Sequence, residues 1–140
     1  MLVRLIYTSR AVPAIDQEEL LTILRQSKAN NAKSGITGAL CFSDGVFIQL
    51  LEGGRSAVNR LYNSIVSDPR HKDVVLLNYE EIEERRFAGW SMGQVNMQRL
   101  NPALLLKYSE CAKLDPTAVS GKVSLALFDE LVATAAIMGQ

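Results

Sequence analysis

The segment Val46 to Leu51 constrains the fold more than any other stretch of this chain, because it is apolar on both faces of a predicted strand. Its apolar residues are Val46, Phe47, Ile48, Leu50 and Leu51, and Gln49 is its one polar residue. A strand of this kind needs other elements packed on both sides of its sheet. The turn sequence SDG joins it to the strand Ile36 to Phe42, which predicts a β-hairpin.

Two predicted helices and three further strands accompany this hairpin. Asp16 and Glu19 resemble a capping box that begins a helix running to about Asn31, and Gly35 ends it. The other elements are the strands Leu2 to Thr8, Val74 to Tyr79 and Trp90 to Val95, and the helix Ser56 to Val66. The order βαββαββ predicts an α+β, ferredoxin-like sheet with both helices on one face.

The C-terminal part of the chain is predicted to be helical. The stretches NPALLLKYSE (101–110) and GKVSLALFDELVATAAIM (121–138) form two predicted helices, the second of them amphipathic. Its apolar stripe consists of Leu127, Phe128, Leu131 and Ala135. We expect these helices to pack on the free face of the sheet, on a second subunit, or on both. No internal repeat or second-domain boundary is visible.

Charge and cysteine content exclude several classes of function. Lysine plus arginine equals aspartate plus glutamate at 15 each, so nothing favours nucleic acid or an anionic membrane as a partner. No apolar run approaches a membrane span, and the N-terminus is typical of a strand rather than a signal peptide. One histidine and two distant cysteines, Cys41 and Cys111, predict free thiols, no metal site and a cytoplasmic location.

Gln49 is the residue that the apolar strand does not explain. A buried amide without partners costs about 1–3 kcal/mol, so another group must bond to it. By strand alternation Tyr7 shares a face with Val3 and Leu5. If the two strands are neighbours, Tyr7 and Gln49 lie within hydrogen-bond reach. Tyr7 is otherwise a core tyrosine with a backbone partner.

Polar residues also gather at the end of the first predicted helix. Ser27, Asn30 and Asn31 place several donors and acceptors at one end of a groove that is otherwise apolar, between the two helices. One of the asparagines is alternatively a helix cap. Apolar walls with a few amides suit a flat heteroaromatic ligand with carbonyl and NH groups.

The loop DPRH offers a charged mouth for this groove. Asp68, Arg70 and His71 are candidates for binding a phosphate there, or are an ordinary surface loop. No Ser-His-Asp spacing and no phosphate-cradling glycine loop is present, and the run YEEIEERRF is typical of a solvated charged surface. The protein is therefore not expected to be an enzyme.

Five motifs in order resemble the BLUF domain, a blue-light sensor that uses flavin. They are RLIYTS, NNAKSGITGALCF, FIQLLEG, DPRH and FAGWSM, and the resemblance covers residues 1 to about 96. We therefore expect a flavin-binding domain over residues 1–97 and a helical extension over 98–140. The segment LLLKYS and the helical C-terminus resemble the short, stand-alone BLUF proteins of the PixD kind.

The resemblance implies a role for each candidate residue. It implies a photochemical pair, Tyr7 and Gln49, and two residues linked to signal output, Trp90 and Met92. The implied flavin-binding residues are Ile23, Ser27, Asn30, Asn31, Ile65, Asp68, Arg70 and His71. Ser64 departs from the pattern, because some short members carry an arginine there. The expected cofactor is FAD, with FMN or riboflavin as alternatives.

The resemblance also implies a mechanism and partners. Tyr7 would donate an electron and a proton and recover both, while the amide of Gln49 changes its hydrogen bonds. Output would pass to an unidentified downstream protein, and we expect a homo-oligomer. The alternative from the residues alone is a non-photoactive small-ligand-binding or assembly module on the same fold. An enzyme is a third and disfavoured reading.

Overall fold

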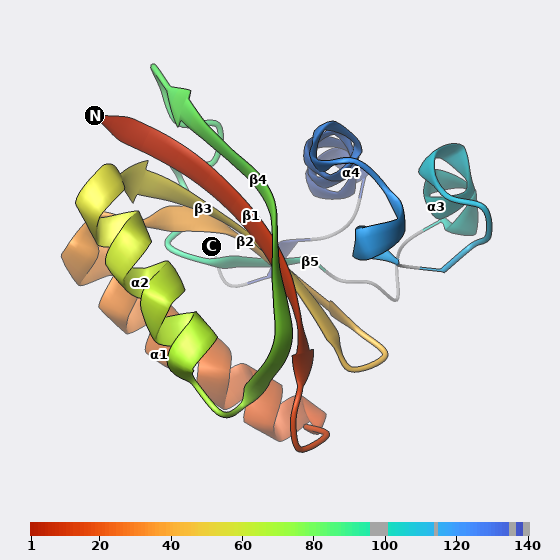
Figure 1. The fold of residues 1–140 in the computed structure, drawn as a ribbon, viewed down its shortest axis with the longest axis horizontal. Helices are drawn as coiled ribbons and strands as arrows, with labels where there is room; N and C mark the ends of the chain where they lie inside the picture. The colour runs from red at the N-terminus through yellow and green to blue at the C-terminus, as the bar shows by residue number, and fades with distance from the viewer. Residues whose placement is uncertain (96–100, 114, 135–136, 139–140) are drawn as a thin grey trace.

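A computed structural model describes residues 1–95, 101–113, 115–134 and 137–138 (Figure 1). The described strands are β1 (Leu2–Ala11), β2 (Thr37–Ser43), β3 (Val46–Gly54), β4 (His71–Ile82), β5 (Gly93–Val95) and β6 (Ile137–Met138). The described helices are α1 (Gln17–Ser34), α2 (Arg55–Ser67), α3 (Pro102–Tyr108) and α4 (Gly121–Thr134), with a 3-10 turn η2 (Pro116–Ala118). The described strands form one sheet in the order β4-β1-β3-β2-β5-β6. This is the predicted ferredoxin-like α+β arrangement.

Local signals in the sequence account for the ends of the early elements. The side chain of Asp16 accepts a hydrogen bond from the Glu19 backbone N–H at 2.8 Å and begins α1. Gly35, at φ 68°, ends the helix in the left-handed conformation. Asp44 and Gly45, at φ 51° and 77°, form the tight turn between β2 and β3. The predicted cap and hairpin are therefore confirmed.

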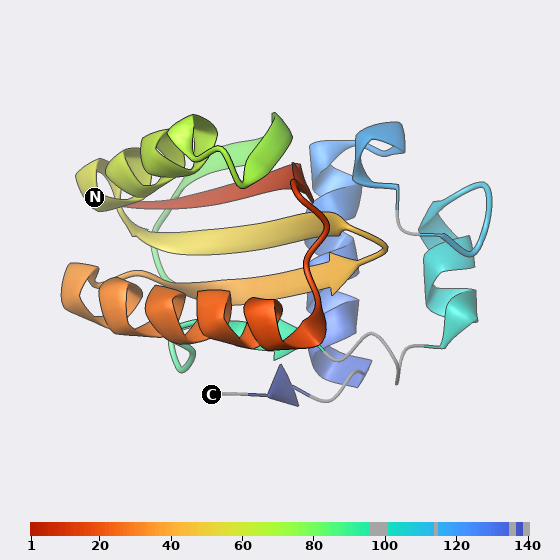
Figure 2. The same ribbon diagram turned by 90° about the horizontal axis from the view of Figure 1, so that it is seen from below.

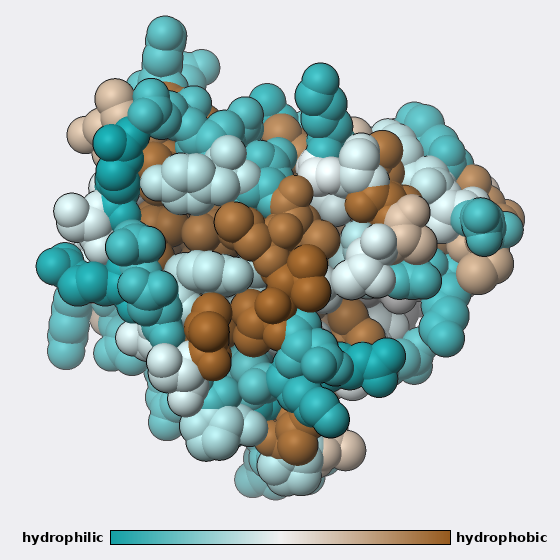
Figure 3. Space-filling model, in the orientation of Figure 1, coloured by the Kyte–Doolittle hydropathy of each residue, from teal (hydrophilic) through white to brown (hydrophobic). Residues whose placement is uncertain are grey.

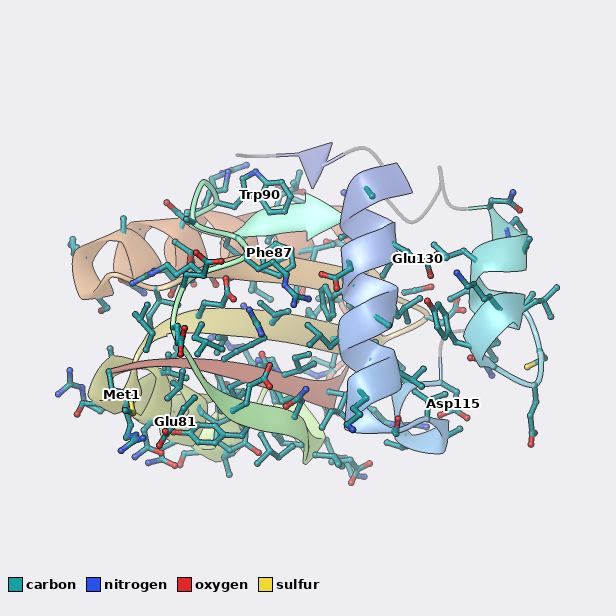
Figure 4. The ribbon with its side chains drawn as sticks, turned by 90° about the horizontal axis from the view of Figure 1, so that it is seen from above. Met1, Glu81, Phe87, Trp90, Asp115 and Glu130 are labelled. Carbon is teal, nitrogen blue, oxygen red and sulfur yellow. The ribbon has the colours of Figure 1, made fainter. Side chains whose placement is uncertain are left out.

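The sheet is covered on both faces, as the apolar β3 requires (Figure 2). Helices α1 and α2 lie on one face, and their apolar side chains pack with those of Val3, Leu5, Phe47 and Leu51. Helix α4 crosses the other face (Figure 4). There its apolar stripe packs on the sheet; the residues that meet are Leu127, Phe128 and Leu131 of α4 and Ile6, Ile48 and Leu50 of the strands. Helix α4 thus packs on the free face of the sheet, which is one of the arrangements expected for the C-terminal helices.

Helix α4 approaches strand β4 closely at its first residue. A Cβ atom added at Gly121 would lie 2.0 Å from the backbone oxygen of Leu77, so only glycine fits without a shift of the helix. Asn78 Nδ2 donates to the Gly121 carbonyl at 3.5 Å from the same strand. Within the described ranges, no helix is long and apolar enough to cross a membrane.

Several predicted element ends differ from the structure. Strand β4 extends beyond the predicted Val74 to Tyr79 at both ends, and β1 and α1 both end later than predicted, at Ala11 and Ser34. Two further differences have tertiary causes. The last strand of the domain begins at Gly93 rather than Trp90, because the Trp90 carbonyl accepts from Gly38 N–H at 3.0 Å before the ladder with β2 starts. The last helix ends at Thr134, and Ile137–Met138 pairs with β5 as strand β6. The predicted domain boundary at 97/98 and the stripe residue Ala135 lie outside the described residues.

Candidate functional site

Tyr7 and Gln49 lie directly opposite each other at the centre of the sheet. They are paired in the register of β1 and β3, so both side chains project towards α1 and α2. The Tyr7 hydroxyl donates to Gln49 Oε1 at 2.5 Å, and the two residues are only 1% and 6% exposed. The hydrogen-bonded pair anticipated from strand alternation is therefore present.

The other end of the Gln49 amide has a different partner. Its Nε2 donates to Met92 Sδ at 3.3 Å, and Met92 is fully buried on the same face of the sheet. Because a phenol donates at one end and a thioether accepts at the other, the present partners match one orientation of the amide. The amide is thus held between two groups of opposite hydrogen-bonding character.

Trp90 and Met92, predicted together as output residues, lie on opposite sides of the sheet. Met92 packs in the cluster beneath α1 and α2, whereas Trp90 packs against the cluster beneath α4. The Trp90 ring lies 5.7 Å from that of Phe87, on the α4 side of the sheet and beside β5 (Figure 4). Met92 therefore touches the site directly and Trp90 does not.

A cavity of about 230 Å³ opens beside this pair, between α1 and α2. Its apolar lining residues are Ile23, Leu40, Phe47, Leu61 and Ile65. Its polar lining residues are Tyr7, Gln26, Ser27, Asn30, Asn31, Gln49, Ser64, Asp68, Arg70 and His71. The structure brings together every residue predicted to bind flavin, and their binding role stays a prediction.

Asn31 joins the cavity to the chain that precedes β5. It is 2% exposed in the last turns of α1, and its Nδ2 donates to the Ser91 carbonyl at 3.2 Å. Its own backbone carbonyl accepts from Ile36 N–H at 2.9 Å. A group that bonds to the Asn31 amide in the cavity would therefore act on a side chain that also holds Ser91.

His71 closes the site next to Tyr7. Its Nδ1 is hydrogen-bonded to Ser9 Oγ at 2.7 Å, and its ring centroid lies 5.2 Å from that of Phe47 and 6.4 Å from that of Tyr7. Burial lowers the pKa of His71, although the Asp68 carboxylate acts in the opposite direction. The imidazole is therefore neutral at pH 7.

Asp68 and Arg70 form an ion pair at the more exposed end of the cavity. Arg70 Nη2 lies 2.7 Å from Asp68 Oδ2, and the Arg70 backbone N–H donates to Asp68 Oδ1 at 2.9 Å. Hydrogen bonding from Arg70 lowers the pKa of the Asp68 carboxyl. The guanidinium is therefore placed at the mouth of the cavity with part of its donor capacity already used.

Burial controls the protonation of Tyr7. Desolvation raises the pKa of its phenol, and the nearby Tyr62 and Asp68 raise it further. Tyr7 is therefore neutral and able to donate its hydrogen bond to Gln49 throughout the physiological pH range.

Five residues that line the cavity were not among the predicted site residues: Gln26, Leu40, Phe47, Leu61 and Ser64, the last of which was noted only as a departure from the family pattern. Leu61 precedes Ile65 by one helical turn, so its position was available from helix spacing. Leu40 lies opposite Gln49 in the β2–β3 register, which the hairpin turn sets. Gln26 follows Ile23 by three residues on α1 and was recoverable in the same way.

Comparison with known proteins agrees with this geometry. A family model described as BLUF, sensors of blue light using FAD, matches residues 2–93. Photoactivated adenylate cyclase subunit beta of Euglena longa is 37% identical over 100 residues, which are 71% of this chain and 12% of that protein. Subunit alpha of Euglena gracilis is 43% identical over 84 residues, which are 60% of this chain and 8% of that protein. The chain thus spans only about a tenth of these relatives.

Two similar solved structures match nearly their whole length. BlsA in its photo-activated state superposes with a TM-score of 0.82 at 30% identity, covering 94% of this chain and 95% of that one. BlrB, described as a BLUF protein in the dark state, gives a TM-score of 0.78 at 35% identity with the same coverage. The match of fold and sequence over the segment that holds the cavity shows that this chain belongs to the BLUF family of blue-light sensors, whose chromophore is a flavin.

Proposed function

We propose that this chain is a blue-light photoreceptor in which the amide of Gln49 stores the light signal by exchanging hydrogen-bond partners. The observation that carries the proposal is the placement of this amide between Tyr7 Oη and Met92 Sδ. A primary amide has an accepting end and a donating end, so its two orientations make different bonds with the same neighbours. The site therefore has two states that need no change in fold.

The described residues fit a flavin in the cavity. Ile23 and Ile65 offer apolar walls from the two helices, and the amides of Asn31 and Gln49 offer donors and acceptors for a ring with carbonyl and NH groups. Arg70 at the mouth suits a polar or phosphorylated tail, as in FAD or FMN; riboflavin would lack the phosphate. When bound, the flavin supplies blue-light absorption and a strongly oxidising excited state.

Tyr7 is the electron and proton donor in this proposal. With a flavin in the cavity, Tyr7 would be the residue placed to give up one electron and one proton and to take both back, and the proton would move along the hydrogen bond that its hydroxyl donates to Gln49 Oε1. Because burial raises the pKa of Tyr7, the proton does not leave ahead of the electron. The cycle has no net redox change, and only the hydrogen bonding of Gln49 differs at its end.

We also infer that output passes through protein–protein contacts, either with a downstream protein or with a second copy of the chain. The supporting observation is the position of the chain around Trp90 and Met92, which touches the site on one face of the sheet and packs beneath α4 on the other. A change at Gln49 thus has a short route to a surface outside the cavity.

Absorption spectroscopy tests the proposal. Protein purified or reconstituted with FAD is expected to be yellow and to show a small, reversible red shift under blue light. Tyr7→Phe removes the donor hydroxyl and Gln49→Leu removes the switching amide, so each is expected to abolish the shift while flavin stays bound. Tyr79→Phe, at a 44% exposed tyrosine on the same sheet, is the matched control and should keep the shift.

Two results would contradict the proposal. Protein that binds no flavin after reconstitution would remove its basis. A normal red shift in Gln49→Leu would show that the amide does not store the signal, and would favour a Tyr7–Gln49 pair that is only structural.

A further inference from the structure

A second buried polar group lies on β3, on the face opposite Gln49. The Glu52 side chain is fully buried, and the Arg4 guanidinium on β1 bonds to its Oε2 through Nε at 2.9 Å and Nη2 at 2.7 Å. Arg4 Nη1 also reaches Glu80 on β4, at 2.7 Å. The charge of Glu52 is therefore paired across the central strands of the sheet.

Glu52 also holds the chain that leads from β4 to β5. The backbone N–H of Arg86 donates to its two oxygens at 3.0 and 3.1 Å, and the backbone N–H of Phe87 donates to Oε1 at 2.8 Å. Hydrogen bonds to an ionised acceptor are stronger than those between neutral groups. The carboxylate thus anchors two consecutive peptide groups in a buried position.

The anchored chain, residues 86–92, is here called the linking segment because it contacts both the site and α4. Towards the site, its Ser91 carbonyl accepts from Asn31 and its Met92 sulfur accepts from Gln49. Towards the other face, Phe87 packs in the cluster beneath α4, and Arg86 Nη1 lies 2.6 Å from Asp129 Oδ2 on α4. Glu52 fixes the beginning of the segment, at Arg86 and Phe87, and Met92 is at its other end.

We propose that Glu52 is a positioning residue for the light switch: it fixes the linking segment so that Met92 Sδ stays in place to accept from Gln49 Nε2. This inference rests on the proposed function and adds a residue to it that lies outside the cavity. Glu52 touches neither the cavity nor Gln49, so its effect is exerted through the segment.

The direction of the effect follows from preorganisation. We take the orientation seen here, with Gln49 Nε2 on Met92 Sδ, as the dark one. The amide returns to it most readily when Met92 Sδ is already in place to accept. If the linking segment is released at Arg86 and Phe87, Met92 is less constrained and the return includes ordering the segment. Dark recovery is therefore expected to slow, while the size of the red shift stays the same because Tyr7, Gln49 and the cavity are intact.

Glu52→Asp is the test variant and Glu81→Asp is its matched control. Aspartate keeps the negative charge, and the long side chain of Arg4 can move to stay paired with it. Its side chain is one methylene shorter, so its carboxylate no longer reaches the backbone N–H groups of Arg86 and Phe87. Glu81 is an exposed residue of β4 that pairs with Arg55, so shortening it makes the same chemical change away from the segment. Two measurements are made on the full chain with FAD: the rate of dark recovery, and hydrogen exchange of the Arg86 and Phe87 amides.

Support for the proposal is a normal red shift in Glu52→Asp, faster exchange of both amides, and recovery about tenfold slower, equivalent to roughly 1.4 kcal/mol in the barrier. Recovery within about twofold of wild type, or faster than wild type, would overturn it. If Glu52→Asp does not fold, the double variant Arg4→Met with Glu52→Met removes both charges together and also every side-chain acceptor for the Arg86 and Phe87 backbone N–H groups, so it carries the same expectation. Failure of the wild-type chain to shift at all would reject the proposed function instead, so the two failures are distinguishable.

Discussion

Two polar residues of the otherwise apolar strand β3, Gln49 and Glu52, have different roles. Gln49 faces α1 and α2 and bonds to Tyr7 and Met92, whereas Glu52 faces α4 and bonds to Arg4 and the linking segment. Residues three apart on a strand point to opposite faces. The same short strand therefore holds the switching amide on one side and an anchor for its acceptor on the other.

His71 is expected to make stability depend on pH just below neutrality. Because burial lowers its pKa in the folded state, the unfolded chain binds a proton near the ordinary value of about 6.5 before the folded chain does. Stability is therefore fully present above that pH and falls as the pH drops towards the lower folded pKa. Thermal unfolding of wild type between pH 7.5 and 5.5 should show the fall, and His71→Gln should show a smaller one.

This assignment is specific because the sequence contains one histidine. Asp68, whose pKa is lowered by Arg70, loses its contribution only at a much lower pH. An equal fall in wild type and His71→Gln would show that another group titrates in this range.

The sequence predicted the positions of some site residues and not of others. Tyr7 and Gln49 could be placed together only on the condition that their strands are neighbours, because both strands are apolar on both faces and no alternation of polar and apolar residues fixes their register. The faces of Trp90 and Met92 could not, because the chain there is held by Gly38 and Asn31 rather than by a strand pattern. Glu52 was visible as a charge at the end of an apolar strand, but its main-chain partners come from a distant loop.

At the scale of elements, α4 is the addition that completes the two-sided sheet. Its stripe of Leu127, Phe128 and Leu131 covers the strands on the face that α1 and α2 leave open. Gly121 lets its first turn approach the backbone of β4, and the ion pair from Asp129 reaches Arg86. The apolar stripe thus holds this helix on the sheet, Gly121 permits its close approach to β4, and the Arg86–Asp129 ion pair links it to the linking segment.

Gly121→Ala is expected to destabilise the chain by about 1–3 kcal/mol, the usual effect of forcing extra atoms into a packed contact. The added Cβ would lie 2.0 Å from the Leu77 carbonyl oxygen, so α4 must move away from β4. Gly89→Ala is the control, since nothing lies within 4 Å of its added Cβ. Denaturant unfolding measures both; equal midpoints for the two variants would argue that α4 is free to shift there.

Element boundaries were predicted where local chemistry decides them and missed where tertiary bonds do. The Asp16 cap and the SDG turn depend on residues within three positions of each other, so the sequence reveals them. Strand β5 is short because it pairs with β2 only at Ala39 and Leu40, which no local pattern indicates. Likewise α4 ends before β6 because Ile137 and Met138 find partners on β5.

On the whole molecule, the apolar surface lies apart from the cavity. Figure 3 shows a hydrophobic region over β4, the strand at the edge of the sheet. Val75, Leu76 and Tyr79 of this strand are 41%, 48% and 44% exposed. Exposed apolar side chains on an edge strand are a common feature of protein–protein interfaces.

We therefore expect size-exclusion chromatography to show self-association through this surface. In the dark the chain should elute above its monomer mass of 15.4 kDa, and illumination should change the elution volume. Leu76→Lys should shift elution towards the monomer, and Tyr7→Phe should remove the effect of light without removing the association. Monomeric elution in both light and dark would rule out self-assembly and leave a different protein as the output partner.

The position of Trp90 makes it an intrinsic fluorescent probe of the linking segment. It is the single tryptophan of the sequence, and it lies in the linking segment against Phe87, on the face away from the cavity. Indole emission responds to local polarity and to quenchers that reach the ring. A movement of the segment that changes the surroundings of Trp90 is therefore expected to change the ultraviolet fluorescence of the unmodified chain, and all of that tryptophan emission comes from this one position.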